Sequence, residues 1–265
     1  MPMTKLDFVD GVYKTKESSL TFIAKLSPSF QFYRQILPIV FKASRLAKRG
    51  LYSDEEWCKS SVNALKALES AGVKFNIRGV DNFINLDVPC VFIGNHMSTL
   101  ETFILPCIIA PYKKVTFVVK QSLVEYPVFK YVMRSRDPIT VTRTNPRDDL
   151  KTVLEGGKKR LSEGVSIIIF PQTTRVLEFD PKEFNTIGIK LAQRSNVPVV
   201  PIALKTDAWE NGSVLKDFGK INPEKTVYFE FGNPLWIKDK GVEEHKQIIN
   251  FIQSKLEEWK TSKIS

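Results

Sequence analysis

Short apolar runs alternate with amphipathic stretches along most of the chain. The apolar runs are bounded by polar residues, Gly or Pro, which is typical of buried strands. The predicted strands span residues 73–79, 90–95, 115–120, 138–143, 165–170, 197–204 and 226–231. The predicted helices span residues 53–71, 98–109, 126–135, 145–161 and 242–260. This alternation predicts a single α/β domain with a mixed, largely parallel central sheet flanked by helices.

The N-terminal segment has a different composition, because residues 18–53 contain Lys and Arg but no Asp or Glu. Its apolar and aromatic side chains recur at four-residue spacing, as in Leu37 and Phe41, which is typical of a helix. Pro28 and Pro38 are expected to break or kink this segment into short helices.

A basic helix with an aromatic face is typical of helices that lie in the headgroup plane of a membrane. We therefore predict two parts of the chain. Residues 1–52 would form basic amphipathic helices that seat the protein on a membrane, and residues 53–265 would form the α/β domain. The alternative is a helical hairpin whose apolar face packs on the main domain.

Composition adds a charge argument. The chain has 39 Lys and Arg against 29 Asp and Glu, a net charge of +10. Such a surplus favours polyanionic partners, either nucleic acid or an anionic membrane, or else reflects a generic solubilising surface. The basic N-terminal residues are interleaved with bulky aliphatic side chains, which suits a bilayer better than stacked bases. No nucleic-acid partner is therefore expected.

Other sequence features indicate the cellular compartment in which the protein is expected. The three cysteines form no CxxC pair, which favours a reducing compartment and small buried side chains over a disulfide framework. The first residues contain acids and no apolar core, so no secretory signal is expected. The chain also lacks an uncharged apolar run of about 18 residues, as a transmembrane helix would need.

The candidate chemistry lies in FIGNHMSTLETF, residues 92–103. His96 follows a predicted strand, and ligands gather at the carboxyl ends of strands in open α/β sheets. Glu101 follows His96 with four residues between them, an HX4E spacing. Because five residues turn a helix by about 500°, the two side chains can meet only if His96 precedes the helix and Glu101 lies in its first turn. Ser98 is the expected N-cap for that geometry.

The same residues have a structural interpretation. Ser98 and Glu101 form a capping box, in which Glu101 reaches back to the Ser98 amide. The sequence lacks the HExxH, GxSxG, Walker A and GxGxxG patterns. With His96 and His245 as the only histidines, a histidine-rich metal site is excluded. His245 is expected to be a solvated residue.

Four blocks in order resemble the 1-acylglycerol-3-phosphate (lysophosphatidic acid) acyltransferase family, in its bacterial lysophospholipid and glycerolipid branch. NHMSTLE is similar to the family's first motif, and Lys120 matches its lysine after the next strand. ITVTR places Arg143 at the end of the second motif, although the glycine that usually opens that motif is absent. FPQTTR, residues 170–175, is similar to FPEGTR, and VPVVPIAL to the proline-bearing fourth motif. The N-terminal helices also look like the family's membrane-seating motif.

The resemblance implies an O-acyltransferase with a glycerolipid acyltransferase-like fold. His96 would deprotonate an acceptor hydroxyl, and Glu101 would orient His96 and stabilise the imidazolium. The cations Lys120, Arg143 and Arg175 would hold an acceptor phosphate or stabilise the oxyanion. The other residues expected to bind substrate are Pro171, Gln172, Thr173 and Thr174.

The resemblance also implies partners and a location. The donor would be acyl-CoA or an acyl carrier protein, the acceptor a lysolipid, and the third partner an anionic membrane surface; no metal or other cofactor is implied. The protein would act in phospholipid biosynthesis as a peripheral protein on the cytoplasmic side of the cell membrane.

Two positions depart from the family pattern. Glu101 replaces the usual aspartate, which changes the reach of the carboxylate and keeps its charge. Gln172 and Thr173 replace Glu and Gly, so that one charge is lost and Thr173 cannot adopt positive φ as glycine does. We therefore keep open an acceptor other than lysophosphatidic acid, and a non-catalytic lipid-binding relative.

Overall fold

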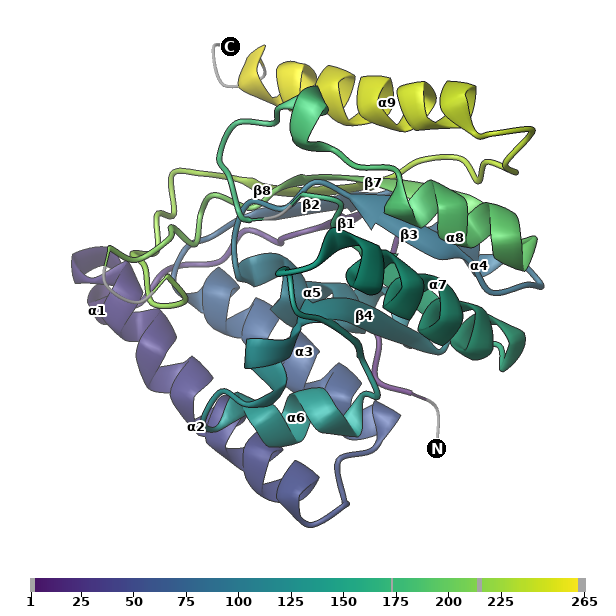
Figure 1. Cartoon of the computed structure of the whole chain (residues 1–265). Coiled ribbons are helices and arrows are strands. Elements are labelled where there is room, and N and C mark those ends of the chain that lie inside the picture. The colour runs from purple at the N-terminus through teal and green to yellow at the C-terminus, as the bar shows by residue number, and fades with distance from the viewer. Residues whose placement is uncertain (1–2, 173, 214–215, 262–265) are drawn as a thin grey trace.

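A computed structural model of the chain describes residues 3–172, 174–213 and 216–261, and within these residues eight strands form one sheet (Figure 1). The strands are β1 (Tyr13–Lys14), β2 (Phe75–Arg78), β3 (Val91–Gly94), β4 (Val115–Lys120), β5 (Ile139–Val141), β6 (Ser166–Ile169), β7 (Val199–Lys205) and β8 (Val227–Phe231). Their order is β1-β2-β8-β7-β3-β6-β4-β5. Only the β1–β2 and β7–β8 pairs of the described strands are antiparallel, so the predicted mixed, largely parallel sheet is confirmed.

Helices cover both faces of this sheet. They are α1 (Phe22–Leu26), α2 (Pro28–Lys48), α3 (Asp54–Ser70), α4 (Asp81–Ile84), α5 (Leu100–Ile109), α6 (Phe129–Ser135), α7 (Pro146–Ser162), α8 (Ile187–Ser195) and α9 (Val242–Thr261). Figure 1 shows α7, α8 and α9 over one face and α2, α3, α5 and α6 over the other. Each layer has its own apolar core, represented by Leu161 and Ile248 on one side and Phe32 and Leu65 on the other.

The helix α2 corrects the prediction that Pro38 helps to divide this segment into short helices. One helix does end before Pro28, which takes the first position of α2. The helix α2 then continues through Pro38 to Lys48. Pro38 and Arg34, whose carbonyl would accept the missing amide hydrogen, both face solvent, where water can replace that bond. Burial of Ile36 and Val40 on the opposite face stabilises the continuous helix.

The helices α1 and α2 have features of both interpretations of the N-terminal segment, as membrane-seating helices and as a helical hairpin packed on the main domain. One face of α2 packs into the same core as α3 and α5. The other face leaves large apolar side chains in solvent, with Phe22 79% and Leu26 76% exposed. No helix in the described part of the chain combines the length and hydropathy needed to cross a bilayer.

The helix α8 is missing from the predicted elements. It is short, and the side-chain oxygen of Asn185, rather than that of the N-cap Thr186, accepts from the Ile187 amide at 3.0 Å. Gly188 lies so close to Ile93 that an added Cβ would be 2.5 Å from that side chain, so α8 also packs closely on β3.

The cysteines are all buried and unpaired. Burial raises the pKa of the Cys58, Cys90 and Cys107 thiols to about 12, which leaves almost no reactive thiolate near neutral pH. Their interpretation as small buried side chains is confirmed.

Candidate active site

The strand order brings the predicted site residues to one edge of the sheet. The strands β3 to β7 run parallel to one another, so their carboxyl ends meet there. His96 follows β3 and Lys120 ends β4. Arg143 follows β5, and the FPQTTR segment, residues 170–175, follows β6. Residues scattered along the sequence are therefore neighbours because of topology.

The turn between β3 and α5 is held by its own side chains. Asn95 forms two hydrogen bonds with β7: its amide donates to the Leu204 carbonyl and its oxygen accepts from the Leu204 amide, both at 2.8 Å. Ser98 Oγ lies 3.0 Å from the carbonyl oxygen of Thr206 and accepts from the Leu100 amide at 3.2 Å. The turn is thereby fixed to the neighbouring strand on both sides of His96.

Glu101 is fully buried, at 0% exposure, and each of its oxygens has a partner. Its Oε1 accepts from the Met97 amide at 2.7 Å and from the Ser98 amide at 3.0 Å. The same oxygen accepts from Thr206 Oγ1 at 2.5 Å. Its Oε2 forms a short hydrogen bond with His96 Nδ1. The first turn of a helix also favours a negative charge, so the burial of this carboxylate is compensated.

The two interpretations of Glu101 are therefore compatible. Glu101 reaches back to the Ser98 amide as a capping box requires, and it contacts His96 from the first turn of α5, as the turn geometry demands. The reciprocal half of the box is not formed, because α5 begins at Leu100 and Ser98 Oγ accepts from Leu100 instead of Glu101. One carboxylate oxygen shapes the turn and the other contacts the imidazole.

His96 has restrained ring and backbone positions. Its ring stacks on Phe170 from the end of β6, with centroids 4.5 Å apart and planes 6° apart. Its amide donates to Gln172 Oε1 at 2.7 Å, and its carbonyl accepts from the Val176 amide at 3.0 Å. The side chain of His96 is 15% exposed. With Nδ1 engaged by Glu101, the ring nitrogen left for a substrate is Nε2.

A cavity of about 400 Å³ opens at His96 and has two chemically different parts. The apolar part lies between α2, α5, β4 and α6, with walls that include Ile39, Val40, Phe103, Phe117, Phe129 and Val132. The polar part is lined by Lys120, Arg143, Thr174, Arg175, Lys216 and Asp217. The cavity can therefore hold an alkyl chain next to an anionic group, with His96 at the same surface.

The predicted substrate-binding residues divide into two groups. Lys120, Arg143, Thr174 and Arg175 line the cavity together with His96. Two others do not line it: the buried Gln172 accepts from the backbone amide of His96, and the carbonyl of Pro171 accepts from the side-chain NH₂ group of Asn185.

Thr173, which is expected not to adopt the positive φ that glycine allows, lies outside the described residues. Gln172 thus meets the His96 backbone, a contact for which the neutral amide oxygen of Gln suffices.

Arg143 has a left-handed backbone conformation, with φ of 63°, that is uncommon for a residue with a side chain. The carboxylate of Asp149 stabilises it, because it accepts from the Thr142 and Arg143 amides at 2.8 and 2.7 Å. This turn brings Arg143 to the edge of the cavity.

The long segment between β7 and β8 supplies residues that the sequence did not indicate. Thr206 donates to Glu101, and Asn211 donates to the Met97 carbonyl at 3.1 Å. Asp217 pairs with Arg175 at 2.8 Å. No local motif marks these positions, which lie more than 100 residues from His96 and contact its neighbours only in the fold.

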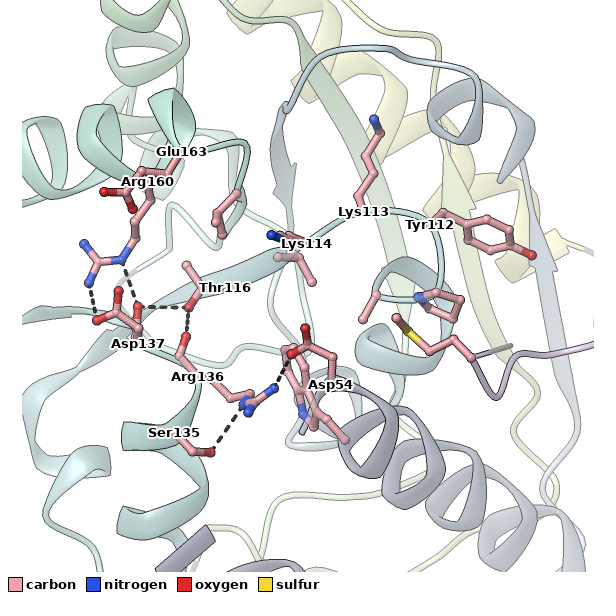
Figure 2. Close-up of a pocket in the computed structure, with 16 residues that line it drawn as sticks. Asp54, Tyr112, Lys113, Lys114, Thr116, Ser135, Arg136, Asp137, Arg160 and Glu163 are labelled. Atoms are coloured by element: carbon pink, nitrogen blue, oxygen red, sulfur yellow. Dashed lines mark hydrogen bonds and ion pairs between the residues drawn. The ribbon is translucent and has the colours of Figure 1, made fainter. Parts of the chain in front are cut away.

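A second cavity of about 360 Å³ lies at the opposite edge of the sheet, where β4 and β6 begin (Figure 2). Its arginines have partners within the protein. Arg136 pairs with Asp54 at 2.6 Å and Arg160 pairs with Asp137 at 2.8 Å, as Figure 2 shows. In the part of the chain that is described, no cluster of His, Cys, Asp and Glu could hold a metal ion. The cavity at His96 is therefore the stronger candidate active site.

Comparisons with known proteins assign the part of the chain that contains this site to a family. A model of the acyltransferase family matches residues 74–205, about half of the chain, which include His96, Glu101 and FPQTTR. The chain belongs to the acyltransferase family. The family match runs from the approach to β2 to the end of β7. The acyltransferase region thus includes each strand whose end contributes to the site.

Curated relatives in this family are named for one activity. The chain is 31% identical over 149 residues to a 1-acyl-sn-glycerol-3-phosphate acyltransferase of Pseudomonas aeruginosa, covering 56% of this chain and 55% of that protein. It is 33% identical over 134 residues to the chloroplastic 1-acyl-sn-glycerol-3-phosphate acyltransferase BAT2 of Brassica napus, covering 49% and 37%. The matches thus span about half of the bacterial relative and less of the plant one.

A solved acyltransferase supports the fold beyond the matched region. The crystal structure of the 1-acyl-sn-glycerophosphate (LPA) acyltransferase PlsC from Thermotoga maritima superposes with a TM-score of 0.63 at 18% identity. The superposition covers 88% of this chain and 95% of that chain. The same fold therefore extends well beyond the region that the family model matches.

Proposed function

We propose that this protein transfers a fatty acyl group from an acyl thioester to the hydroxyl of a lysophospholipid-type acceptor. One observation supports the proposal most strongly: the imidazole of His96 is held by the buried Glu101 at a cavity that is apolar on one side and basic on the other. The acyltransferase activity for which the relatives are named is consistent with this arrangement.

In the proposed reaction, His96 Nε2 takes the proton of the acceptor hydroxyl as its oxygen attacks the thioester carbonyl carbon. Glu101 holds Nδ1 and stabilises the imidazolium that forms, as the carboxylate does in a His–Asp pair. Collapse of the tetrahedral intermediate breaks the carbon–sulfur bond. The proton then passes from His96 to the departing thiolate, which returns the base to its starting state without a covalent acyl-enzyme.

The two parts of the cavity suit the two halves of such a substrate pair. The aromatic and aliphatic walls would bury an alkyl chain, which gains about 0.8 kcal/mol for each buried CH₂ group. The cations Lys120, Arg143 and Arg175 would attract an acceptor phosphate or stabilise the oxyanion. Acyl-CoA and acyl carrier protein are both retained as donors, because each presents an acyl thioester.

The first proposed acceptor is lysophosphatidate, the substrate for which the relatives are named. An acceptor with another headgroup is the second candidate, because FPQTTR lacks the charge of the family's glutamate. A lipid-binding protein without turnover is the remaining alternative.

A transfer assay with purified protein separates these possibilities. An acyl thioester would be incubated with lysophosphatidate, other lysophospholipids and 1-monoacylglycerol, while free thiol and acylated product are measured together. We expect thiol release that depends on the acceptor and equals the product in amount. Lipid binding without product from any acceptor would contradict the proposed transferase and support the lipid-binding alternative.

A membrane position also belongs to the proposal. The exposed apolar side chains of α1 and α2 lie among exposed cations that include Lys25, Lys42 and Arg45. Ile39 and Val40 of α2 also form a wall of the cavity, so a lipid chain could enter it directly from a membrane. We propose that the α1–α2 part of residues 1–52 seats the α/β domain, whose sheet also includes β1 from this segment, as a peripheral protein on the cytoplasmic side of the cell membrane.

The Phe22→Asp variant is expected to bind anionic phospholipid vesicles at least about tenfold more weakly than the native protein, because an exposed Phe that enters a bilayer gains about 1.5–3 kcal/mol. Vesicle cosedimentation measures the effect. Val242→Asp is the matched control: Val242 is 56% exposed and begins α9 on the other face of the sheet. Equal binding of the native protein and both variants would contradict the proposal that α1 contacts the membrane.

A further inference from the structure

The polar part of the cavity contains one internal anion. Asp217 supplies the only carboxylate among the described residues that line the cavity, next to Lys120, Arg143, Arg175 and Lys216. Its Oδ1 lies 2.8 Å from Arg175 Nη1 and accepts from Thr99 Oγ1 at 2.9 Å. Arg175 also donates to Thr99 Oγ1, so the three side chains form a closed cluster.

Asp217 is held in place by the residues that follow it. Phe218 stacks on Tyr33 of α2, with ring centroids 6.0 Å apart, and the Tyr33 hydroxyl donates to the Gly219 carbonyl at 2.7 Å. The Ile221 amide donates to Ser29 Oγ at 3.0 Å. The carboxylate is therefore presented to Arg175 by a segment anchored on α2.

We propose that Asp217 is a specificity-determining residue of the headgroup site. The inference rests on the proposed transferase function, and it concerns which acceptor that site prefers. The Asp217 carboxylate forms an ion pair with Arg175, and its negative charge weakens the binding of any anionic headgroup. The effect increases with the negative charge of the headgroup, so it disfavours a phosphomonoester more than a phosphodiester.

The size of the effect follows from Coulomb's law, in which the repulsion from Asp217 is proportional to the ligand charge. A phosphomonoester has a charge of about −1.5 to −2 near neutral pH, a phosphodiester about −1, and a monoacylglycerol none. If removal of Asp217 strengthens monoester binding about tenfold, it strengthens diester binding only about threefold, because half the charge gives half the free energy. A neutral acceptor is unaffected.

The experiment measures equilibrium binding by titration calorimetry, without an acyl donor and in a neutral detergent. The ligands are lysophosphatidate, lysophosphatidylglycerol and 1-monoacylglycerol, and the proteins are native, Asp217→Asn and Glu210→Gln. Asn keeps the shape of Asp and can still accept from Thr99, so only the charge is lost. Glu210 is the matched control, because it belongs to the same segment, pairs with Lys225 at 3.4 Å and does not line the cavity.

We expect Asp217→Asn to bind lysophosphatidate about tenfold tighter and lysophosphatidylglycerol about threefold tighter than the native protein does, and to bind 1-monoacylglycerol with unchanged affinity. Glu210→Gln should bind all three ligands as the native protein does. An equal response to all three ligands, or weaker binding of the monoester, would overturn the proposal. If the Asn variant is insoluble, Asp217→Ser gives the same comparison. Because binding needs no turnover, failure here is distinct from absence of acyl transfer, which would contradict the proposed function alone.

Discussion

The His96→Ala variant is expected to lose about 10²–10⁴-fold in acyl-transfer rate at saturating acceptor, which is typical of the removal of a general base. The loss should appear in kcat, because the base acts in the transition state and the cations that would bind the acceptor remain. The thermal transition should fall only moderately, because the backbone contacts of His96 with Gln172 and Val176 remain while Oε2 of the buried Glu101 loses its imidazole partner. The assay is release of free thiol with and without acceptor.

His245→Ala is the matched control for this substitution. His245, the other histidine of the chain, lies in α9 and stacks on Phe184, on the opposite side of the sheet from the apolar part of the cavity. Burial lowers the pKa of His245, and this half-buried residue differs from the solvated residue expected from the sequence. A native rate in His96→Ala, or an equal loss in both variants, would refute the assignment of His96 as the base.

The sequence was informative where structure is local. The apolar runs predicted the strands from β2 to β8, and the helices predicted to begin at Ser53 and Asn145 correspond to α3 and α7, of which these two residues are the N-caps. The meeting of His96 and Glu101 also depends on one turn and the first residues of one helix. Such features follow from backbone geometry over a few residues, so that a single sequence is sufficient to predict them.

Features that depend on long-range packing could not be predicted in this way. The insertion of β6 between β3 and β4 has no local signal, and neither does the continuation of α2 through Pro38, which burial of its inner face stabilises. The contacts of Thr206 with Glu101 and of Asp217 with Arg175 join distant segments. The interpretation of Gln172 changed for the same reason, because its partner is a backbone amide 76 residues away.

The second large effect is expected for Glu101→Gln, which should lower the transfer rate by about 10²–10⁴-fold at a small cost in stability. The Met97 and Ser98 amides and the Thr206 hydroxyl all donate to one oxygen of residue 101, so the Gln oxygen must take that position. The Gln NH₂ group then faces His96 Nδ1 and donates to it. This contact puts the imidazole proton on Nε2, where a base needs a lone pair.

Two further variants separate the charge of Glu101 from its structural role. Glu101→Ala leaves the Met97 and Ser98 amides buried without a partner, which costs about 1–3 kcal/mol for each group and should lower the melting temperature as well as the rate. Glu101→Asp keeps the charge with a shorter reach and should retain more activity than Glu101→Gln. If Glu101→Gln instead had the native rate and Glu101→Ala only melted earlier, the carboxylate would merely cap α5, and His96 would act without an orienting partner.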